Sequence, residues 1–299
     1  MIHFAALGIV VNPHGLVEQR VACPQCAKGG HDTALGVNVV TGAYHCFRCS
    51  WKGCAGRETA FPRGRPVSRF DDPAMIERKR ERLRRIWKDS VPLNHRYAGA
   101  VRTYFESRAL GEILNAPPAN LRAHSGLEYW DRTSSLGTYP AMVALLTGAG
   151  GQPVTLHVTY LRGDGCAKAT VPSPKKIMPV PMRGATKGGA IHLYRPRAGV
   201  LGIAEGVESA LSMHLLQKLP VWSSYCADNL ERALLPAGLR ELHIGIDLDA
   251  GGKGEQVANG LAMRMRRFSP RTKVVLITPE VDGTGDLNDE LRRRQYGHR

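Results

Sequence analysis

Two pairs of cysteines place the strongest constraint on how the N-terminal part of this chain can fold. Cys23 and Cys26 form one CxxC pair, Cys46 and Cys49 form another, and 19 residues separate the two pairs. Each CxxC turn directs two thiolates at one point, and the intervening sequence ALGVNVVTGAYH predicts a two-stranded hairpin that brings the pairs together. Four thiolates in a tetrahedral arrangement predict one structural zinc ion, with no open coordination position for catalysis.

Aromatic and basic residues surround the second cysteine pair. A mixture of this kind suits stacking on single-stranded bases, and its members are Tyr44, Phe47, Arg48, Trp51 and Lys52. For Phe47 and Trp51, packing inside the small ribbon is an equally good interpretation. Cys54, just beyond the second pair, is expected to be a spare thiol.

Composition indicates the class of partner. Lys and Arg number 41 against 26 Asp and Glu, so the formal net charge is +15, which favours a polyanion such as nucleic acid. A basic protein without such a partner is the alternative. The first twenty residues lack the basic start of a signal peptide, and no run approaches the ~20 apolar residues of a membrane span. We therefore expect a cytoplasmic protein that does not associate with membranes.

The 299 residues suffice for two or three domains. Their patterning predicts a zinc ribbon at residues 1–54, a flexible basic linker at 55–71, a mixed α+β region at 72–197 and an α/β region at 198–299. A helix capped by Asp72 is expected to run to about Lys88. From residue 198 onward strands alternate with helices, which predicts a mostly parallel sheet covered by helices.

Acidic residues follow three of the expected strands in the last region. Glu205 follows VLGIA, Asp247 and Asp249 follow LHIGI, and Asp286 lies beyond KVVLITP. Parallel sheets bind ligands at the carboxyl ends of their strands, and two residues spaced by one project to the same side of an extended chain. Gathered carboxylates repel one another unless a cation lies between them, which predicts bound Mg²⁺ or Mn²⁺. For any single aspartate here, capping a helix is the alternative.

Basic residues crowd the segment before these strands: Arg162, Lys168, Lys175, Lys176, Arg183 and Lys187. Such side chains hold triphosphates and nucleic-acid phosphates, although each alone could equally be a solvated surface charge. Glu208, one turn into the helix after Glu205, is expected to be a favourable charge at a helix N-terminus rather than a ligand.

The segments IAEGVESAL, GIDLDAGGKG and GDLND resemble, in this order, the Toprim domain of DnaG-type primases, topoisomerases and some nucleases. The resemblance covers about Val200 to Leu291. A CxxC ribbon ahead of these motifs narrows it to primases of phages and plasmids and to phage primase–helicases, and GGQPVTLHVTYLRGDGCAKA also looks like that group. Cellular DnaG ribbons commonly have a histidine among the zinc ligands, where this chain has Cys26.

The resemblance implies a DNA primase, a nucleotidyltransferase that joins NTPs into a short RNA primer on a single-stranded DNA template. Glu205 would be the general base or a metal-coordinating acid, and Asp247 and Asp249 would hold the catalytic Mg²⁺ or Mn²⁺. Asp286 would be an additional ligand, whereas Asp289 is expected to cap the following helix.

The same resemblance implies a function for the basic residues. Lys168, Lys175 and Lys176 would contact the NTP or the template, with Arg162 and Lys187 as further candidates. The chain has no GxxxxGK[ST] phosphate-binding loop, so a replicative helicase is expected as a separate chain in a bacterial cell or a phage-infected host.

Two alternatives from other classes stay open at this point. A Toprim nuclease would use the same carboxylates to hydrolyse a phosphodiester. A non-catalytic replication factor would bind DNA through the zinc ribbon and retain only a vestigial acidic site. A topoisomerase would need a nucleophilic tyrosine on a large separate domain, for which this chain is too short.

Overall fold

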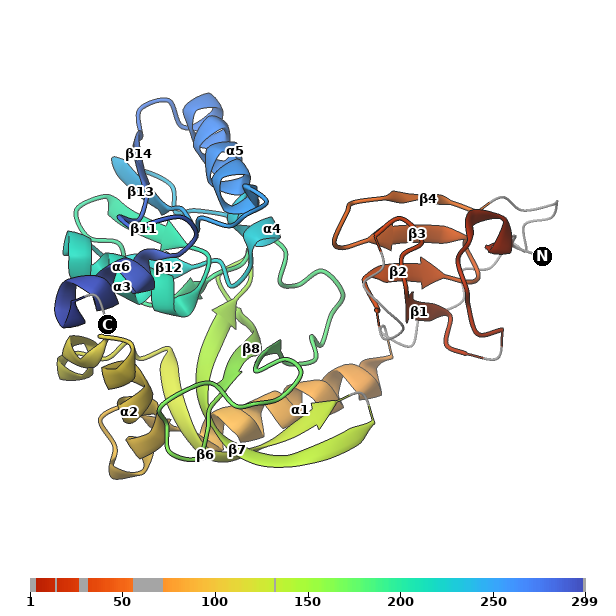
Figure 1. Cartoon of the computed structure of the whole chain (residues 1–299), viewed down its shortest axis with the longest axis horizontal. Coiled ribbons are helices and arrows are strands. Elements are labelled where there is room, and N and C mark those ends of the chain that lie inside the picture. The colour runs from red at the N-terminus through yellow and green to blue at the C-terminus, as the bar shows by residue number, and fades with distance from the viewer. Residues whose placement is uncertain (1–3, 14, 27–31, 56–71, 132, 298–299) are drawn as a thin grey trace. The chain divides into compact units, whose positions relative to one another are not determined.

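The computed structural model describes residues 4–13, 15–26, 32–55, 72–131 and 133–297 (Figure 1). The chain divides into two compact units, Met1–Pro66 and Val67–Arg299. The predicted linker at 55–71 lies outside the described residues except for Ala55, which is buried in the first unit.

The first unit is a four-stranded antiparallel sheet in the order β1-β2-β3-β4. Its strands are β1 (Glu18–Val21), β2 (Leu35–Asn38), β3 (Ala43–Cys46) and β4 (Lys52–Cys54). The predicted hairpin between the cysteine pairs is confirmed as β2 and β3. Its turn needs Gly42, whose φ is 80° and on which a Cβ would lie 2.6 Å from the carbonyl oxygen of Ala55. The small core gathers Phe4, Ile9, Leu35 and Val37 around Cys23 and Cys46.

The second unit begins with α1 (Pro73–Asp89), which Asp72 caps by accepting a hydrogen bond of 2.9 Å from the Ala74 amide, as predicted. An antiparallel sheet follows in the order β5-β6-β7-β8-β9. It consists of β5 (Val91–Pro92), β6 (Leu121–Asp131), β7 (Ser134–Thr147), β8 (Pro153–Tyr160) and β9 (Lys175–Ile177), and α2 (Gly99–Ser107) lies between the first two strands in sequence. Ile86 of α1 packs with Val143 and Val158 on one face of this sheet.

The second sheet of this unit has the order β10-β12-β11-β13-β14. Its strands are β10 (Ile191–His192), β11 (Val200–Ala204), β12 (Val221–Ser223), β13 (Glu241–Gly245) and β14 (Lys273–Ile277). The pairs β12–β11, β11–β13 and β13–β14 are parallel, and β10 is an antiparallel edge strand. The fold class predicted from the sequence is therefore confirmed: a small cysteine-bearing β unit, a mixed α+β part and an α/β part with a mostly parallel sheet.

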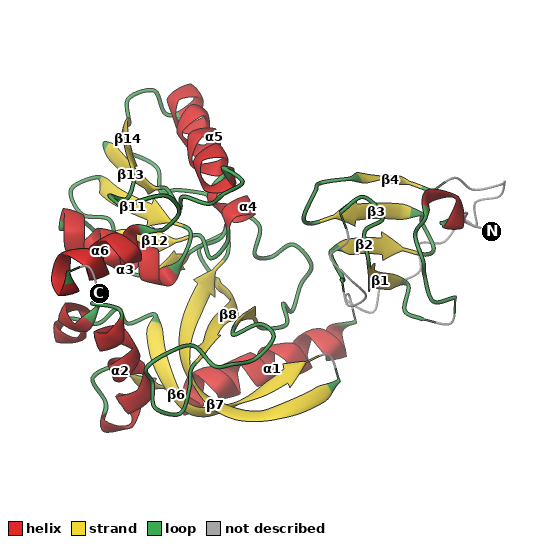
Figure 2. Ribbon diagram, in the orientation of Figure 1, coloured by secondary structure: helices red, strands yellow, loops and turns green. Residues whose placement is uncertain are grey.

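Helices cover both faces of the parallel sheet (Figure 2). These helices are α3 (Val207–Gln217), α4 (Ala227–Leu230), α5 (Lys253–Phe268) and α6 (Leu287–Tyr296). Leu261 of α5 packs into a core with Leu242 and Ile244 on one face. Leu211 of α3 belongs to a different core, which also contains Phe105 of α2 and Met142 of β7. Helix α3 thus lies between the two halves of the unit, so that a polar residue on it can contact both.

Candidate active site and zinc site

The four paired cysteines converge at one point of the first unit. Their Sγ atoms all lie within 4.8 Å of one another, with 3.8 Å between Cys23 and Cys49 and 3.6 Å between Cys26 and Cys46. Zinc–sulfur bonds of about 2.3 Å in a tetrahedron require sulfur atoms about 3.8 Å apart. Within the described part of the chain, no other cluster of three or more metal-binding side chains is this close. The cysteines could therefore hold one zinc ion.

The aromatic residues of this unit differ in their surroundings. Phe47 is 52% exposed. The guanidinium of Arg20 lies 3.9 Å from its ring centroid, and a Cβ on Gly36 would lie 3.0 Å from the ring. Trp51 instead packs against Tyr44, with 4.6 Å between ring centroids, at the margin of the core. Of the two residues with alternative interpretations, Phe47 is therefore the exposed one.

We expect removal of the cluster to unfold the first unit selectively. The substitution Cys46→Ala should abolish zinc binding, because three thiolates leave the tetrahedron incomplete and this unit is too small to fold on apolar contacts alone. Metal analysis should find about one zinc per chain in the wild type and none in the variant, and amide NMR should show loss of dispersion confined to the first unit. Cys54→Ser is the control, since Cys54 donates to the Thr41 carbonyl oxygen outside the cluster. A fully metallated Cys46→Ala variant would contradict the assignment.

Three carboxylates lie at the carboxyl edge of the parallel sheet, near enough for the charges of two of them to act on the third. Glu205 follows β11, Asp247 lies just beyond β13, and Asp286 precedes α6; all three are partly buried. Oδ1 of Asp247 is buried and has no hydrogen-bond partner among the described residues. Burial, followed by the charges of Asp286 and Glu205, raises the pKa of Asp247 to about 7, and burial likewise raises the pKa of Glu205. An unpartnered carboxylate oxygen among like charges fits the binding of a hard divalent cation.

Asp249 has a different environment. Its Oδ1 accepts hydrogen bonds from the amides of Gly251 (2.9 Å) and Lys253 (3.2 Å), and its Oδ2 accepts one of 2.7 Å from Gly254. These hydrogen bonds lower the pKa of the Asp249 carboxyl group, and the bond from Gly254 makes the largest contribution. The helix-capping alternative considered for single aspartates therefore applies to Asp249, which binds the start of α5 and has fewer lone pairs left for a metal than Asp247.

Asp286 also forms hydrogen bonds that stabilise the start of α6. Its Oδ1 accepts from the amides of Asn288 (2.7 Å) and Asp289 (3.1 Å), and its Oδ2 accepts 3.0 Å from the Ser209 hydroxyl. The Asp289 side chain accepts in return from the Asp286 amide at 3.2 Å. The N-cap of α6 is thus Asp286, in extended conformation. Asp289 takes part in capping the same helix, as expected, because at the third helical position it completes a capping box with Asp286.

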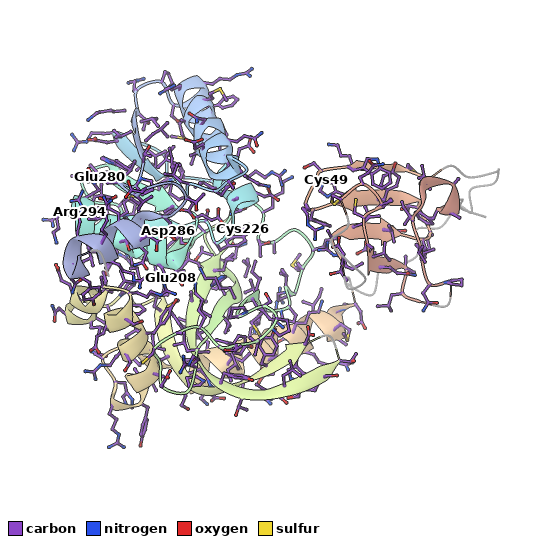
Figure 3. The ribbon with its side chains drawn as sticks, viewed as in Figure 1. Cys49, Glu208, Cys226, Glu280, Asp286 and Arg294 are labelled. Atoms are coloured by element: carbon purple, nitrogen blue, oxygen red, sulfur yellow. The ribbon has the colours of Figure 1, made fainter. Side chains whose placement is uncertain are left out.

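Glu208 is the residue whose environment differs most from expectation. It lies in the first turn of α3, but it is only 5% exposed and does not act as a solvated charge at a helix end. The position of Glu208 in the fold is labelled in Figure 3. Its carboxylate accepts a hydrogen bond of 2.9 Å from the Tyr104 hydroxyl and pairs with Lys175 at 3.1 Å and Lys168 at 3.4 Å. Burial alone would raise the pKa of Glu208, but the two ammonium groups outweigh burial and hold it far below its ordinary value.

The sequence of α3, VESALSMHLLQ, carries a signal for this cluster, because Glu208 is its one residue among Asp, Glu, Lys and Arg. Every residue of α3 from Val207 to Met213 is buried, so the helix has no polar face on which a glutamate could be solvated. A charge in such a helix requires a partner from elsewhere in the fold. The partner could not be identified from spacing, because Tyr104 lies 104 residues away and Lys175 33 residues away.

The basic residues proposed to contact NTP or template are dispersed. Lys176 follows Lys175 on β9 and so has the opposite orientation; it lies 3.8 Å from the Tyr129 ring centroid and donates to the Trp130 carbonyl oxygen. Arg162 pairs with Asp164 at 2.6 Å on the surface. Lys187 lines a pocket of about 650 Å³, together with Arg80, Trp87 and other residues. Lys168 and Lys175 alone of the five predicted residues pair with Glu208.

Comparison with known proteins identifies two parts of the chain. The Toprim domain profile matches residues 200–296, and a domain of unknown function, DUF7146, matches residues 77–188. No curated protein matches. Among the described residues, no helix is both long and apolar enough to span a lipid bilayer.

Several solved structures align at low similarity. The primase fragment of the bacteriophage T7 primase–helicase is 13% identical with a TM-score of 0.39, over 93% of this chain and 98% of its own. The zinc-binding and RNA polymerase domains of the Aquifex aeolicus primase are 14% identical with a TM-score of 0.41, over 97% and 77%. The DnaG catalytic core is 11% identical with a TM-score of 0.47, over 75% and 76%. The profile match and the parallel sheet with its acidic edge identify residues 200–296 as a Toprim domain, which confirms the resemblance inferred from the sequence.

Proposed function

We propose that this protein is a DNA primase that makes short RNA primers from NTPs on single-stranded DNA. The observation that carries the proposal is the acidic edge of the Toprim domain, where Asp247 has a buried, unpartnered oxygen beside Glu205 and Asp286. The four-cysteine cluster in the same chain and the net charge of +15 support nucleic acid as the partner.

The reaction joins the 3′-oxygen of one nucleotide to the α-phosphorus of the next and releases pyrophosphate. Mg²⁺ or Mn²⁺ held by Asp247, with Glu205 and Asp286 beside it, would lower the pKa of the attacking hydroxyl and neutralise the leaving pyrophosphate. Glu205, whose pKa burial raises, would be a stronger base than an exposed glutamate and is suited to accept the hydroxyl proton. Asp249 holds the start of α5 in place through its three amide contacts and is a weaker candidate ligand.

The NTP, the single-stranded template and the helicase would each be bound by different parts of the protein or by another chain. Lys168 and Lys175 would bind the triphosphate, since both pair with Glu208 and the charge of Lys175 acts on Glu205 and Asp247. Phe47 and Arg20 on the zinc ribbon would stack on bases of the single-stranded template. A replicative helicase would be supplied by another chain.

An assay with labelled NTPs, Mg²⁺ and single-stranded DNA tests the proposal. Formation of labelled oligoribonucleotides that depends on both template and metal is the expected result. Shortened template without labelled product would instead indicate a Toprim nuclease, and binding of template with neither outcome would indicate a non-catalytic DNA-binding factor. Each of the last two results would overturn the assignment as a primase.

A further inference from the structure

The ion pairs of Glu208 connect the two halves of the second unit. Glu208 belongs to α3 of the Toprim domain, whereas Lys168 and Lys175 come from the segment around β9 and Tyr104 comes from α2. The Glu208 side chain is 6% exposed, and those of Lys168 and Lys175 are 29% and 39% exposed. One buried carboxylate therefore holds two lysines whose side chains are partly exposed.

The net charge of this group is positive. Two ammonium groups face one carboxylate, and the nearby His157 adds no charge near neutral pH, because burial first and the lysines second lower its pKa to about 4. Ion pairing with Glu208 opposes burial and raises the pKa of Lys175 above its ordinary value, so this lysine stays charged. A surplus positive charge is thus held in place beside a buried carboxylate, where the partly buried lysines would be costly without their partner.

The ammonium group of Lys175 lies close to the acidic edge, which Glu205, Asp247 and Asp286 form. Lys175 Nζ lies 3.9 Å from the position a Cβ would occupy on Gly206, the residue immediately after Glu205. The charge of Lys175 acts on the carboxyl groups of Glu205 and Asp247. Glu208, three residues after Glu205, cannot itself be a member of that edge while Tyr104 and both lysines occupy its oxygens.

We propose that Glu208 is a positioning residue that holds the ammonium groups of Lys168 and Lys175 beside the acidic edge, where they bind the triphosphate of the incoming nucleotide. Without the carboxylate the two ammonium groups repel each other and separate, and the triphosphate loses its preformed site. This inference rests on the proposed function for the identity of the ligand, but the pairing itself stands on the contacts of Glu208.

Glu208→Gln tests the proposal, because it preserves the size of the side chain and removes its charge. We expect the KM for NTP in primer synthesis to rise about tenfold, with a smaller change in kcat. In a Lys168→Gln/Lys175→Gln background the same substitution should change KM by less than about twofold, since there is nothing left to position. An equal effect in both backgrounds would show a merely structural role and would overturn the proposal.

A matched control variant distinguishes a loss of positioning from a loss of stability. Glu290 of α6 is also buried, at 4% exposure, and pairs with Arg294 at 2.7 Å away from the lysines, so Glu290→Gln should affect stability without changing KM for NTP.

Tyr104→Phe removes one hydrogen bond to Glu208 and leaves all charges in place. It should raise KM by about threefold, again only while the lysines are present. An unchanged KM in a folded Tyr104→Phe variant, together with equal effects of Glu208→Gln and Glu290→Gln, would overturn the proposal.

Equilibrium binding of a fluorescent ATP analogue separates this proposal from the primase assignment. If the wild type binds the analogue but makes no primer, the assignment as a primase fails, while weaker binding by Glu208→Gln would still support positioning. If the wild type makes primers and Glu208→Gln binds the analogue as tightly, positioning fails and the primase assignment stands. Absence of triphosphate binding by the wild type would overturn the positioning role as well.

Discussion

Asp247→Asn is expected to lower primer synthesis by at least about a thousandfold, because it removes the carboxylate best placed to hold a divalent cation. Asparagine keeps the shape of the side chain, so packing at the end of β13 should be unchanged. Synthesis should be measured over a range of Mg²⁺ and Mn²⁺ concentrations, since a weakened metal site is partly rescued by more metal whereas a lost one is not. Asp282→Asn is the control, with a side chain that is 94% exposed. Synthesis within about tenfold of the wild type would contradict the role of Asp247.

The same substitution should stabilise the protein in the absence of divalent metal. The pKa of Asp247 is about 7 in the folded chain and about 3.8 ordinarily, so between these values the folded state binds the extra proton. Stability therefore falls as pH rises from about 4 to about 7, by at most about 4 kcal/mol, and the loss is complete above the folded pKa. Asparagine carries no charge and does not incur this loss.

Urea unfolding with a chelator present at several pH values measures this effect. Asp247→Asn should unfold at higher urea than the wild type at pH 8, and the difference should vanish below about pH 4, where the wild-type carboxyl is protonated in both states. Added Mg²⁺ should stabilise the wild type and leave the variant unchanged. Equal stability of the two proteins at pH 8 would show that the carboxylate experiences no net repulsion at this edge.

Features encoded by local spacing were predictable from the sequence. The CxxC pairs, the hairpin between them, the capped start of α1 and the alternation of strands with helices after residue 198 each depend on residues close together in the chain. The three acidic positions after strands also follow from local pattern, because the ends of parallel strands meet at one edge. That these acidic residues lie at one edge could therefore be predicted without knowing any contact between distant residues.

Strand β6 is only partly defined by its own sequence. Leu121, Ala123, Leu127 and Tyr129 are buried and alternate with more exposed residues, but the alternation breaks at the exposed Ser125 and Gly126, and the pairing with β7 shifts register twice. Strand β7 likewise begins at Ser134, ahead of the apolar run starting at Ala141 that marks it in the sequence. A long strand that bends through bulges is defined by its partner strand, which single-sequence periodicity does not reveal.

The chemistry of each acidic residue depended on contacts that the sequence does not specify. Asp247 and Asp249 are equivalent in the motif, yet the amides at the start of α5 bind only Asp249. Glu208 has the position of a helix-terminal charge, yet two lysines of another subdomain surround it. A motif therefore identifies which residue types can act, whereas packing decides which oxygens are already occupied.

Gly254→Ala is expected to destabilise the second unit by about 3 kcal/mol, although alanine normally stabilises a helix by up to 1 kcal/mol relative to glycine. Gly254 lies in the first turn of α5, directly against the end of β13. A Cβ on it would lie 2.9 Å from the carbonyl carbon of Asp247 and would overlap the carbonyl oxygen. Neither atom belongs to a flexible side chain, so relief requires α5 and the backbone of Asp247 to separate.

That separation would also damage the acidic edge. The Gly254 amide donates the 2.7 Å hydrogen bond to Asp249, and the backbone that must shift carries the Asp247 carboxylate. Because a displacement of about 1 Å at a reacting centre can lower a rate about a hundredfold, primer synthesis at a temperature where the variant is folded should fall by a similar factor. Gly99→Ala is the control, since Gly99 begins α2 and a Cβ there meets no atom within 4 Å. If Gly254→Ala is as stable and as active as Gly99→Ala, then α5 does not pack on the strand end as described, and the support that Asp249 and α5 give to Asp247 is absent.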